Sequence, residues 1–340
     1  MAIDFVISWA DTTDPEWLAR RSRFVAPVER DEHGDFAAKN QPWDTLRYLF
    51  RGIDRHCPWV GRVHLVVPPG QRPDWLNTLH PKLRVVDQDT LLAAEHVPTF
   101  NSNAIEMNLH RIPDLADDFV YFNDDMLVLA PIEAEHFFPG GAPADFAIMN
   151  ALSGGDALSH YLLNSIGVIN RNFDKRQVLR AGLGRWFNPK YGAGLLRNLL
   201  LLPWPGFTGF FEPHLPIALR KRTIEALWER EPAIMQATSA SRVRELSNLS
   251  PFVFRYWQIC SGDFEPVCPK SYGIFYELGR DDIGSITASI RSGKQPLVCV
   301  NDGAAQDFDA QRLILLGALE HALPGPSSFE LRASNEKVTV

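Results

Sequence analysis

The chain has 340 residues, of which 45% are hydrophobic and 22% charged, and its formal net charge is −7. This ordinary globular usage argues against disorder, and the length suits a single α/β domain over residues 1–323 with a helix-rich insertion at about 172–262. An acidic chain without a Lys/Arg block lacks the positive surface that nucleic-acid binding requires, so we expect no nucleic-acid partner.

The first half of the chain alternates short apolar runs with amphipathic stretches. Runs rich in β-branched and aromatic residues predict strands, at residues 3–9, 62–67, 83–86 and 119–122. Apolar residues at helical spacing predict helices, at residues 43–56, 74–79 and 99–112. In the last of these, Asn103, Glu106 and His110 are spaced to lie along one face. The alternation predicts a mostly parallel sheet flanked by helices.

The second half of the chain is mainly helical. Its periodicity predicts helices, at residues 217–229, 251–259 and 306–322, and strands, at residues 146–149, 166–169 and 297–300. Two segments lack a periodic pattern. We therefore expect a mobile loop at residues 26–41 and a flexible tail at residues 324–340.

One apolar segment, residues 192–211, is about long enough to cross a bilayer. Arg197, Pro203 and Pro205 interrupt it, so we expect a buried helix followed by a loop. A peripheral contact with a membrane surface or with a capsule-assembly complex is the alternative.

The four cysteines form no C-x-x-C pair, which disfavours a zinc or redox site. Reduced thiols are typical of cytoplasmic proteins. The segment after Met1 does not resemble a secretory signal, because Asp4 stands inside the first apolar run. We therefore expect a cytoplasmic protein, with attachment to the inner face of the membrane as the alternative.

Three predicted strands each end in polar or acidic residues: Asp11 after the first, Asn123, Asp124 and Asp125 after the fourth, and Asp302 after the strand at 297–300. Ligands of open α/β sheets bind outside the carboxyl ends of the strands, so these acids meet at one edge if the strands are parallel neighbours. Crowded carboxylates repel unless a cation lies among them, and their oxygens suit Mg²⁺ or Mn²⁺. The alternative is that Asp and Asn merely begin turns.

Several basic residues are candidates for phosphate binding or proton transfer, since Arg binds phosphate oxygens in pairs and histidine titrates near neutral pH. They are His110, Arg111, His214, Arg220 and Arg255. Taken singly, each is more often a surface or structural residue. No G-x-x-x-x-G-K-[ST], G-x-G-x-x-G or G-x-S-x-G motif is present, which disfavours a P-loop kinase, a Rossmann dehydrogenase and an α/β-hydrolase.

These segments together resemble the Stealth family of hexose-1-phosphate transferases, which includes bacterial capsular and exopolysaccharide phosphotransferases. The resemblance follows the order of the family's four conserved regions, at residues 3–17, 46–67 with 97–128, 213–228 continuing to 257, and 298–302. The first region departs from the family pattern at Ala10 and at Thr12–Thr13, and residues 150–211 match no family segment, which leaves acceptor specificity open.

The resemblance implies an α/β fold of the nucleotide-sugar transferase (GT-A-like) type. It implies that a glycan hydroxyl attacks the sugar-linked phosphate of a nucleotide sugar, with a UDP-sugar favoured, and that a nucleoside monophosphate leaves. Combined with the residue pattern, it gives each candidate a role: metal ligands Asp124, Asp125 and Asp302; phosphate clamps Arg255 and Arg111; general base His214 or, second, His110; and substrate contacts Asp11, Asn101, Asn103, Asn123 and Arg220.

Two other functions fit part of the same pattern. A metal-dependent glycosyltransferase needs similar acids but transfers the sugar without its phosphate. A non-catalytic glycan-binding protein would show neither metal dependence nor donor turnover. Release of nucleoside monophosphate, of diphosphate or of neither separates the three hypotheses.

Overall fold

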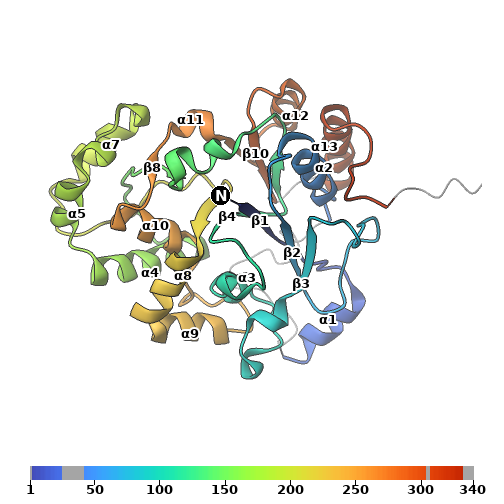
Figure 1. The fold of residues 1–340 in the computed structure, drawn as a ribbon, viewed down its shortest axis with the longest axis horizontal. Coiled ribbons are helices and arrows are strands. Elements are labelled where there is room, and N and C mark those ends of the chain that lie inside the picture. Colours follow the sequence, from blue (N-terminus) through green and yellow to red (C-terminus); the bar gives the residue numbers. More distant parts are fainter. Residues whose placement is uncertain (1, 25–41, 304–306, 332–340) are drawn as a thin grey trace, which may run out of the picture.

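The structure is a computed structural model that describes residues 2–24, 42–303 and 307–331, so most of the predicted loop at 26–41 lies outside the described residues. Its central sheet has five strands in the order β3-β2-β1-β4-β7 (Figure 1). The bounds of these strands are Leu83–Asp87, Val63–Val67, Ile3–Ser8, Asp118–Asn123 and Ile217–Arg220. The first four strands are parallel and β7 is antiparallel to β4. The predicted mostly parallel α/β sheet is confirmed.

The core of this sheet forms because β1, β2 and β4 are apolar and buried on both faces. Phe5 lies at its centre, with its ring against those of Trp59, Phe122 and Phe137. Aromatic pairs of this kind add to the free energy gained from burying apolar area. The central strands therefore form a rigid support for the loops that follow their carboxyl ends.

The carboxylate of Asp4 is buried in this core. It accepts hydrogen bonds from the backbone N–H groups of Arg62 (2.8 Å) and Ala116 (3.0 Å), and it lies 3.1 Å from Nε2 of the buried His64. Burial alone would raise the pKa of Asp4, but these hydrogen bonds lower it below its usual value. The ionised carboxylate is thus the form that the fold stabilises.

We expect replacement of Asp4 by Ala to lower the free energy of unfolding by about 3 kcal/mol, because two backbone donors and His64 lose their acceptor. Because the folded-state pKa of Asp4 is depressed, its contribution is complete above the unfolded value of 3.8 and is lost as the pH falls through the folded value. Urea unfolding of the wild type and D4A at pH 7 and near pH 3 measures this. An equal difference between the two proteins at both pH values would contradict it.

A second, three-stranded sheet lies beside the first and has the order β5-β10-β9, with bounds Met126–Val128, Leu297–Asn301 and Ile274–Glu277. Strand β10 is antiparallel to β5 and parallel to β9. Helices α12 (Ile283–Ser292) and α13 (Phe308–Ala322) pack against each other, and their apolar residues share a core with this sheet. Helix α2 (Leu46–His56) approaches β5 so closely that a Cβ at Gly52 would lie 2.2 Å from the carbonyl oxygen of Val128.

The remaining helices form a lobe next to β7 and β4, at the left of Figure 1. It contains α4 (Ala157–Asn172), α5 (Lys175–Ala181), α6 (Leu183–Trp186), α7 (Gly194–Leu201), α8 (Lys221–Arg230), α9 (Pro232–Ala240) and α10 (Phe252–Ser261). The short helices α1 (Pro15–Ser22), α3 (Ser102–Glu106) and α11 (Pro269–Tyr272) and the two-stranded sheet of β6 (Ala144–Asp145) and β8 (Glu265–Pro266) complete the fold. Within the described ranges, none of the helices combines the length and apolarity needed to cross a membrane.

Several sequence-based predictions of elements were wrong. The strand predicted at residues 146–149 is absent apart from an isolated bridge between Met149 and Phe210. Residues 166–169 lie inside α4, because an apolar run of four residues fits a buried helix as well as a strand. The helix predicted at 217–229 begins as β7, and α8 starts only at Lys221. Residues 74–79 form turns with a bridge between Leu76 and Glu330.

The first part of the expected flexible tail is anchored instead. Phe329 is 1% exposed, and Glu330 lies 2.9 Å from the buried guanidinium of Arg51. Its Oε1 also accepts a hydrogen bond from the backbone N–H of Ser327. Residues 324–331 are therefore part of the folded domain, and residues 332–340 lie outside the described residues.

Candidate active site

The carboxyl ends of β4 and β10 meet at a tight turn. Ser8 at the end of β1 pairs with Asn123 at the end of β4, and Asp124 and Asp125 then turn the chain into β5. The backbone N–H of Val300, in β10, donates to the carbonyl oxygen of Asp125 at 2.9 Å. The expectation that β10 is a parallel neighbour of β1 and β4 was wrong, since β10 pairs with β5 and β9 in the second sheet. The turn at Asp124 and Asp125 joins the two sheets and still brings the carboxylates together.

His214 reaches the same place because β7 runs antiparallel to β4. Ile217, at the start of β7, lies opposite Tyr121 near the end of β4, so the loop before β7 returns to the carboxyl edge. There the Nε2 atom of His214 lies 3.5 Å from Oδ2 of Asp125. His214 has a φ of 48°, in the left-handed region that non-glycine residues seldom adopt, so the surrounding packing holds it in place.

Two aromatic rings fix the orientation of the His214 imidazole. Phe275 meets it edge-on at a centroid distance of 5.5 Å, and Phe252 lies 6.4 Å away. Burial alone would lower the pKa of His214, but the Asp125 carboxylate raises it above the usual value. The imidazole is therefore part of an acidic cluster and can exchange a proton with it.

The carboxylates of this cluster repel one another in a partly buried site. Burial and the neighbouring Asp125 raise the pKa of Asp124 to about 7. Burial, Asp124 and Asp125 raise the pKa of Asp302 to about 8. Carboxylates whose ionised form is destabilised in this way bind either a proton or a cation. A divalent cation bound among these carboxylates would relieve their repulsion.

The donor set fits such a cation. One ligand atom each from Asp125, His214 and Cys299 lie within 4.8 Å of one another. Burial keeps the pKa of Cys299 well above its usual value, and its thiol lies 3.4 Å from Oδ2 of Asp125 as a hydrogen-bond donor. Oδ1 of Asp125 is buried without a hydrogen-bond partner among the described residues. In this set the carboxylate of Asp125, with its free buried oxygen, suits a hard cation better than the protonated thiol does.

Comparison with known proteins shows similarity over nearly the whole chain. A family model described as "Stealth protein CR2, conserved region 2" matches residues 39–144 of the chain. The capsular polysaccharide phosphotransferase WcwK of Streptococcus pneumoniae is 33% identical over 330 residues, which cover 96% of this chain and 98% of WcwK. The receptor polysaccharide phosphotransferase WefC of Streptococcus gordonii is 35% identical over 335 residues, which cover 97% of this chain and 99% of WefC. The chain belongs to the Stealth family.

The predicted membership of the Stealth phosphotransferases is thus confirmed over nearly the whole chain. Among solved structures, mouse xyloside xylosyltransferase 1 is similar at 13% identity and a TM-score of 0.36, covering 88% of this chain and 97% of that chain. This likeness is too distant to add to the assignment of the site.

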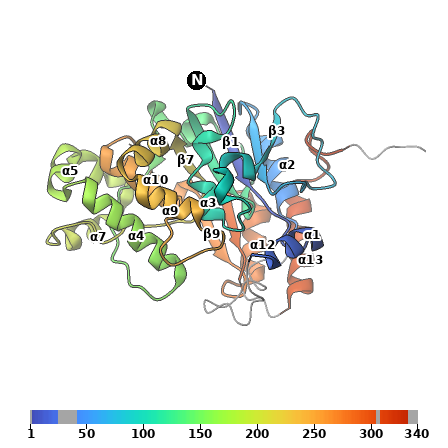
Figure 2. The same cartoon turned by 90° about the horizontal axis from the view of Figure 1, so that it is seen from below.

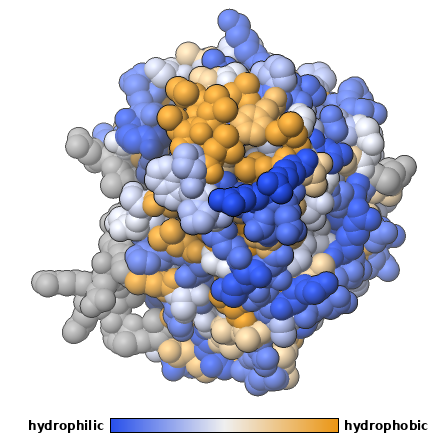
Figure 3. Space-filling view, turned by 90° about the vertical axis from the view of Figure 1, so that its left-hand side faces the viewer, coloured by the Kyte–Doolittle hydropathy of each residue, from blue (hydrophilic) through white to orange (hydrophobic). Residues whose placement is uncertain are grey.

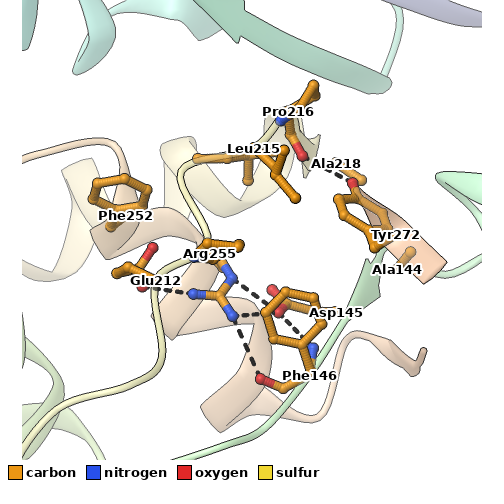
Figure 4. A pocket seen from close by; sticks show the side chains of 12 residues that line it. Ala144, Asp145, Phe146, Glu212, Leu215, Pro216, Ala218, Phe252, Arg255 and Tyr272 are labelled. Carbon is orange, nitrogen blue, oxygen red and sulfur yellow. Dashed lines mark hydrogen bonds and ion pairs between the residues drawn. The ribbon is translucent and has the colours of Figure 1, made fainter. Parts of the chain in front are cut away.

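Arg255 of this Stealth phosphotransferase is buried in α10, and each nitrogen of its guanidinium has a protein partner. Nε donates to Asp145 at 2.8 Å, Nη1 donates to Glu212 at 2.5 Å, and Nη2 lies 2.7 Å from Asp145 (Figure 4). Nη1 also donates to the Phe211 carbonyl oxygen at 2.8 Å. Because Phe211 and Glu212 directly precede the loop of His214, Arg255 supports that loop. The structure shows no free guanidinium edge for the phosphate clamp expected from the sequence.

Glu106 and Glu212 are acidic residues close enough to His214 to affect its pKa, and the sequence pattern marked neither as a candidate site residue. Tyr121 donates to Oε1 of Glu106 at 2.8 Å, while Oε2 of Glu106 and Nδ2 of Asn103 are buried without a hydrogen-bond partner in the described part of the chain. Burial raises the pKa of Glu106, and it raises that of Glu212 to about 7. Glu106 stood on the predicted polar face of the helix at 99–112, which was the one available signal.

Asn101 has a structural role in this structure. Its side chain caps α3 by accepting from the N–H of Asn103 at 3.1 Å. Its Nδ2 donates to the Ser241 carbonyl oxygen at 3.0 Å and to Asn248 at 2.8 Å. Since Asn101 is completely buried, the expected contact with sugar hydroxyls is not supported. Asn103, two residues later, keeps a free buried donor and stays a candidate for that contact.

Arg220 lies at the opposite edge of the sheet. It pairs in register with Asp118, the first residue of β4, whereas Asp125 follows the last residue of that strand. Its guanidinium contacts Asp118 at 3.2 Å and also Asp263. The antiparallel direction of β7 therefore carries Arg220 away from the site, and its expected substrate contact is not supported.

The predicted polar helix at 99–112 is broken, which separates His110 and Arg111 from the site. Helix α3 ends at Glu106, and His110 and Arg111 lie in a separate 3-10 turn, Leu109–Arg111, packed on α8. There the Arg111 guanidinium lies over the Trp228 ring at 5.0 Å. Burial lowers the pKa of His110 to about 4, which favours a neutral structural histidine. The alternative of His110 as the base and the phosphate contact of Arg111 therefore lose support.

Asp11 lies in the loop after β1, at the carboxyl edge of the sheet. Its carboxylate accepts from the N–H and the hydroxyl of Thr13, at 2.9 and 2.6 Å, and its own N–H donates to Gln71. Asn123 ends β4 immediately before the two acidic residues. Both therefore remain at the edge where their predicted substrate contacts would be made.

Proposed function

We propose that this Stealth phosphotransferase transfers a sugar 1-phosphate from a nucleotide diphosphate sugar, with a UDP-sugar favoured, to a hydroxyl of a glycan acceptor in surface-polysaccharide synthesis. The acceptor oxygen bonds to the sugar-linked phosphorus, the bond from that phosphorus to the bridging oxygen breaks, and nucleoside monophosphate leaves. The observation that supports this is the meeting of His214 with Asp125 beside Asp124 and Asp302. The names of WcwK and WefC, both polysaccharide phosphotransferases, support the class of acceptor.

The acidic cluster would hold a divalent cation, Mg²⁺ or Mn²⁺, through Asp124, Asp125 and Asp302. When bound, the cation would neutralise charge on the diphosphate, as phosphoryl transfer commonly requires. The free Oδ1 of Asp125 and the raised pKa values of Asp124 and Asp302 support this set of ligands.

His214 accepts the proton of the attacking hydroxyl in this proposal. Its Nε2 lies 3.5 Å from Oδ2 of Asp125, and we assign the proton of the neutral imidazole to Nε2, which makes Nδ1 the acceptor. Arg255 and Glu212 act indirectly, by holding the loop that carries His214. Asn103, Asn123 and Asp11 lie where they can contact the donor, and Asn103 has a free donor group for a sugar hydroxyl.

Incubation with a panel of nucleotide sugars, a glycan acceptor and Mg²⁺ or Mn²⁺ tests the reaction. We expect release of nucleoside monophosphate and a phosphodiester product. Release of nucleoside diphosphate would instead support transfer of the sugar without its phosphate.

Replacing His214 with Ala is expected to lower kcat by about a hundredfold, since general-base catalysis typically contributes that much or more. His136 supplies a matched control, because its imidazole lies 3.1 Å from the Tyr272 carbonyl oxygen and stacks on the Tyr272 ring. H136A is expected to keep kcat within a few-fold while losing some stability. Steady-state kinetics with a nucleotide sugar that the enzyme accepts measures kcat for both variants. An H214A enzyme with unchanged kcat would exclude His214 as the base.

A further inference from the structure

Helix α7 is built with its apolar side outward. Within this eight-residue helix, the one buried side chain is the polar Asn198, while Leu196, Leu199 and Leu200 are 54–64% exposed. Leu183 and Trp204, on either side of α7 in sequence, are 61% and 52% exposed. Figure 3 shows hydrophobic side chains gathered on this end of the molecule. Such a patch on a folded protein marks an interaction surface.

Hydrogen bonds hold α7 in this orientation. The Nδ2 atom of Asn198 donates to the carbonyl oxygens of Ala147 and Trp186, and its Oδ1 accepts from the N–H of Met149 at 2.7 Å. At the other end, the buried Lys175 donates to the carbonyl oxygens of Leu201 and Trp204, at 2.6 and 2.9 Å. A buried polar network of this kind fixes the exposed leucines in place rather than letting the helix turn them inward.

The charge of this lobe differs in sign from that of the whole protein. Residues 157–211 contain seven Lys or Arg residues and one acidic residue, Asp174, although the chain has a net charge of −7. Arg176, Arg180, Arg185, Lys190 and Arg197 are exposed. In Figure 3 strongly hydrophilic side chains adjoin the hydrophobic patch. Exposed leucines and a tryptophan beside basic residues are the combination that binds an anionic membrane surface.

We propose that this face, formed by α7 with Leu183 and Trp204 and by the basic residues of α5 to α7, docks the protein on an anionic lipid surface. The leucines and Trp204 enter the interface and the Arg and Lys side chains contact lipid phosphates. The surface is linked to the catalytic loop, because the chain runs from Trp204 to His214 within ten residues and Asn150 pairs with Gly209 along this path. Docking goes beyond the proposed reaction and does not depend on it.

Sedimentation of the full chain with lipid vesicles tests the proposal. We expect binding to phosphatidylglycerol vesicles, weaker binding to phosphatidylcholine vesicles, and a loss of binding as NaCl screens the charges. The double variant L196S/L200S should bind phosphatidylglycerol vesicles about tenfold or more weakly. L313S is the matched control, since Leu313 on α13 is 69% exposed and lies in the other part of the fold, and it should bind like the wild type.

Circular dichroism and nucleotide release with a soluble acceptor keep loss of folding separate from loss of docking, and L196S/L200S should match the wild type in both. Three results would overturn the proposal: no vesicle binding by the wild type, equal loss of binding in L313S, or a wild-type dimer that L196S/L200S converts to a monomer without any vesicle binding. The last result would make the face a contact between two copies of the chain.

Discussion

Replacing Asp125 with Asn is expected to lower turnover by about a thousandfold or more while the protein stays folded. Asp125 contacts both His214 and Cys299, and its Oδ1 is buried without a hydrogen-bond partner among the described residues. Asn keeps the size of the side chain but removes the charge that holds a cation and polarises the imidazole. Steady-state kinetics with saturating Mg²⁺ or Mn²⁺ measures the loss, and a thermal melt close to that of the wild type shows that the fold is retained.

Two controls sharpen this test. D114N changes the same functional group where the side chain is 79% exposed and lies 3.8 Å from Arg62, so activity should stay within about twofold of the wild type. Chelation of divalent cations should abolish activity of the wild type, and added Mg²⁺ or Mn²⁺ should restore it. Near-normal turnover by D125N, or full turnover after complete chelation, would exclude the proposed role of the acidic cluster.

Replacing Arg255 with Met is expected to lower the free energy of unfolding by about 3–5 kcal/mol, because it leaves the buried Asp145 and the largely covered Glu212 without their cation. Arg255 lies 2.7 Å from Asp145, which is buried, and 2.5 Å from Glu212, whose side chain is 11% exposed. Denaturant unfolding measures the change. The triple variant R255M/D145N/E212Q should recover part of the loss, since it also removes the uncompensated charges.

R222M is the matched control, because Arg222 is 67% exposed and its ion pair with Asp263 at 2.8 Å lies on the surface. It should change the free energy of unfolding by no more than about 1 kcal/mol. If R255M kept the wild-type stability and only raised KM for the donor, Arg255 would be a direct phosphate ligand, as the sequence alone indicated.

Apolar runs and helical spacing predicted most of the central sheet and several helices, but they were less dependable where one element runs directly into the next. The strands at β1, β2, β3 and β4 are apolar runs bounded by turn residues, and α2, α10 and α13 follow their helical spacing. The prediction failed at β7, where IALR continues directly into the helical KRTIEALWER. Whether such a run pairs with β4 depends on a free strand edge that the local sequence does not contain.

The residues of the candidate site also divide into those that the sequence predicted and those whose position depended on the tertiary structure. The sequence predicted Asp124, Asp125, Asp302 and His214 as site residues, because acids that follow buried strands gather at a sheet edge and a family motif surrounds the histidine. It misplaced Arg220, whose position depends on the direction of β7, and His110, whose helix ends at Glu106. It gave no sign of Glu212 as the partner of Arg255, since that pair joins residues 43 positions apart.

The sequence by itself determined the α/β class and the family, and it predicted the acidic residues of the proposed site, because these depend on residue type and on spacing within single strands and turns. Only the tertiary structure decided which basic residues reach the acidic cluster. It also decided that Arg255 pairs with Asp145 and Glu212, and that the leucines of α7 face outward. Those outcomes depend on strand direction and on which buried polar groups find partners, and both are set by packing between segments far apart in the chain.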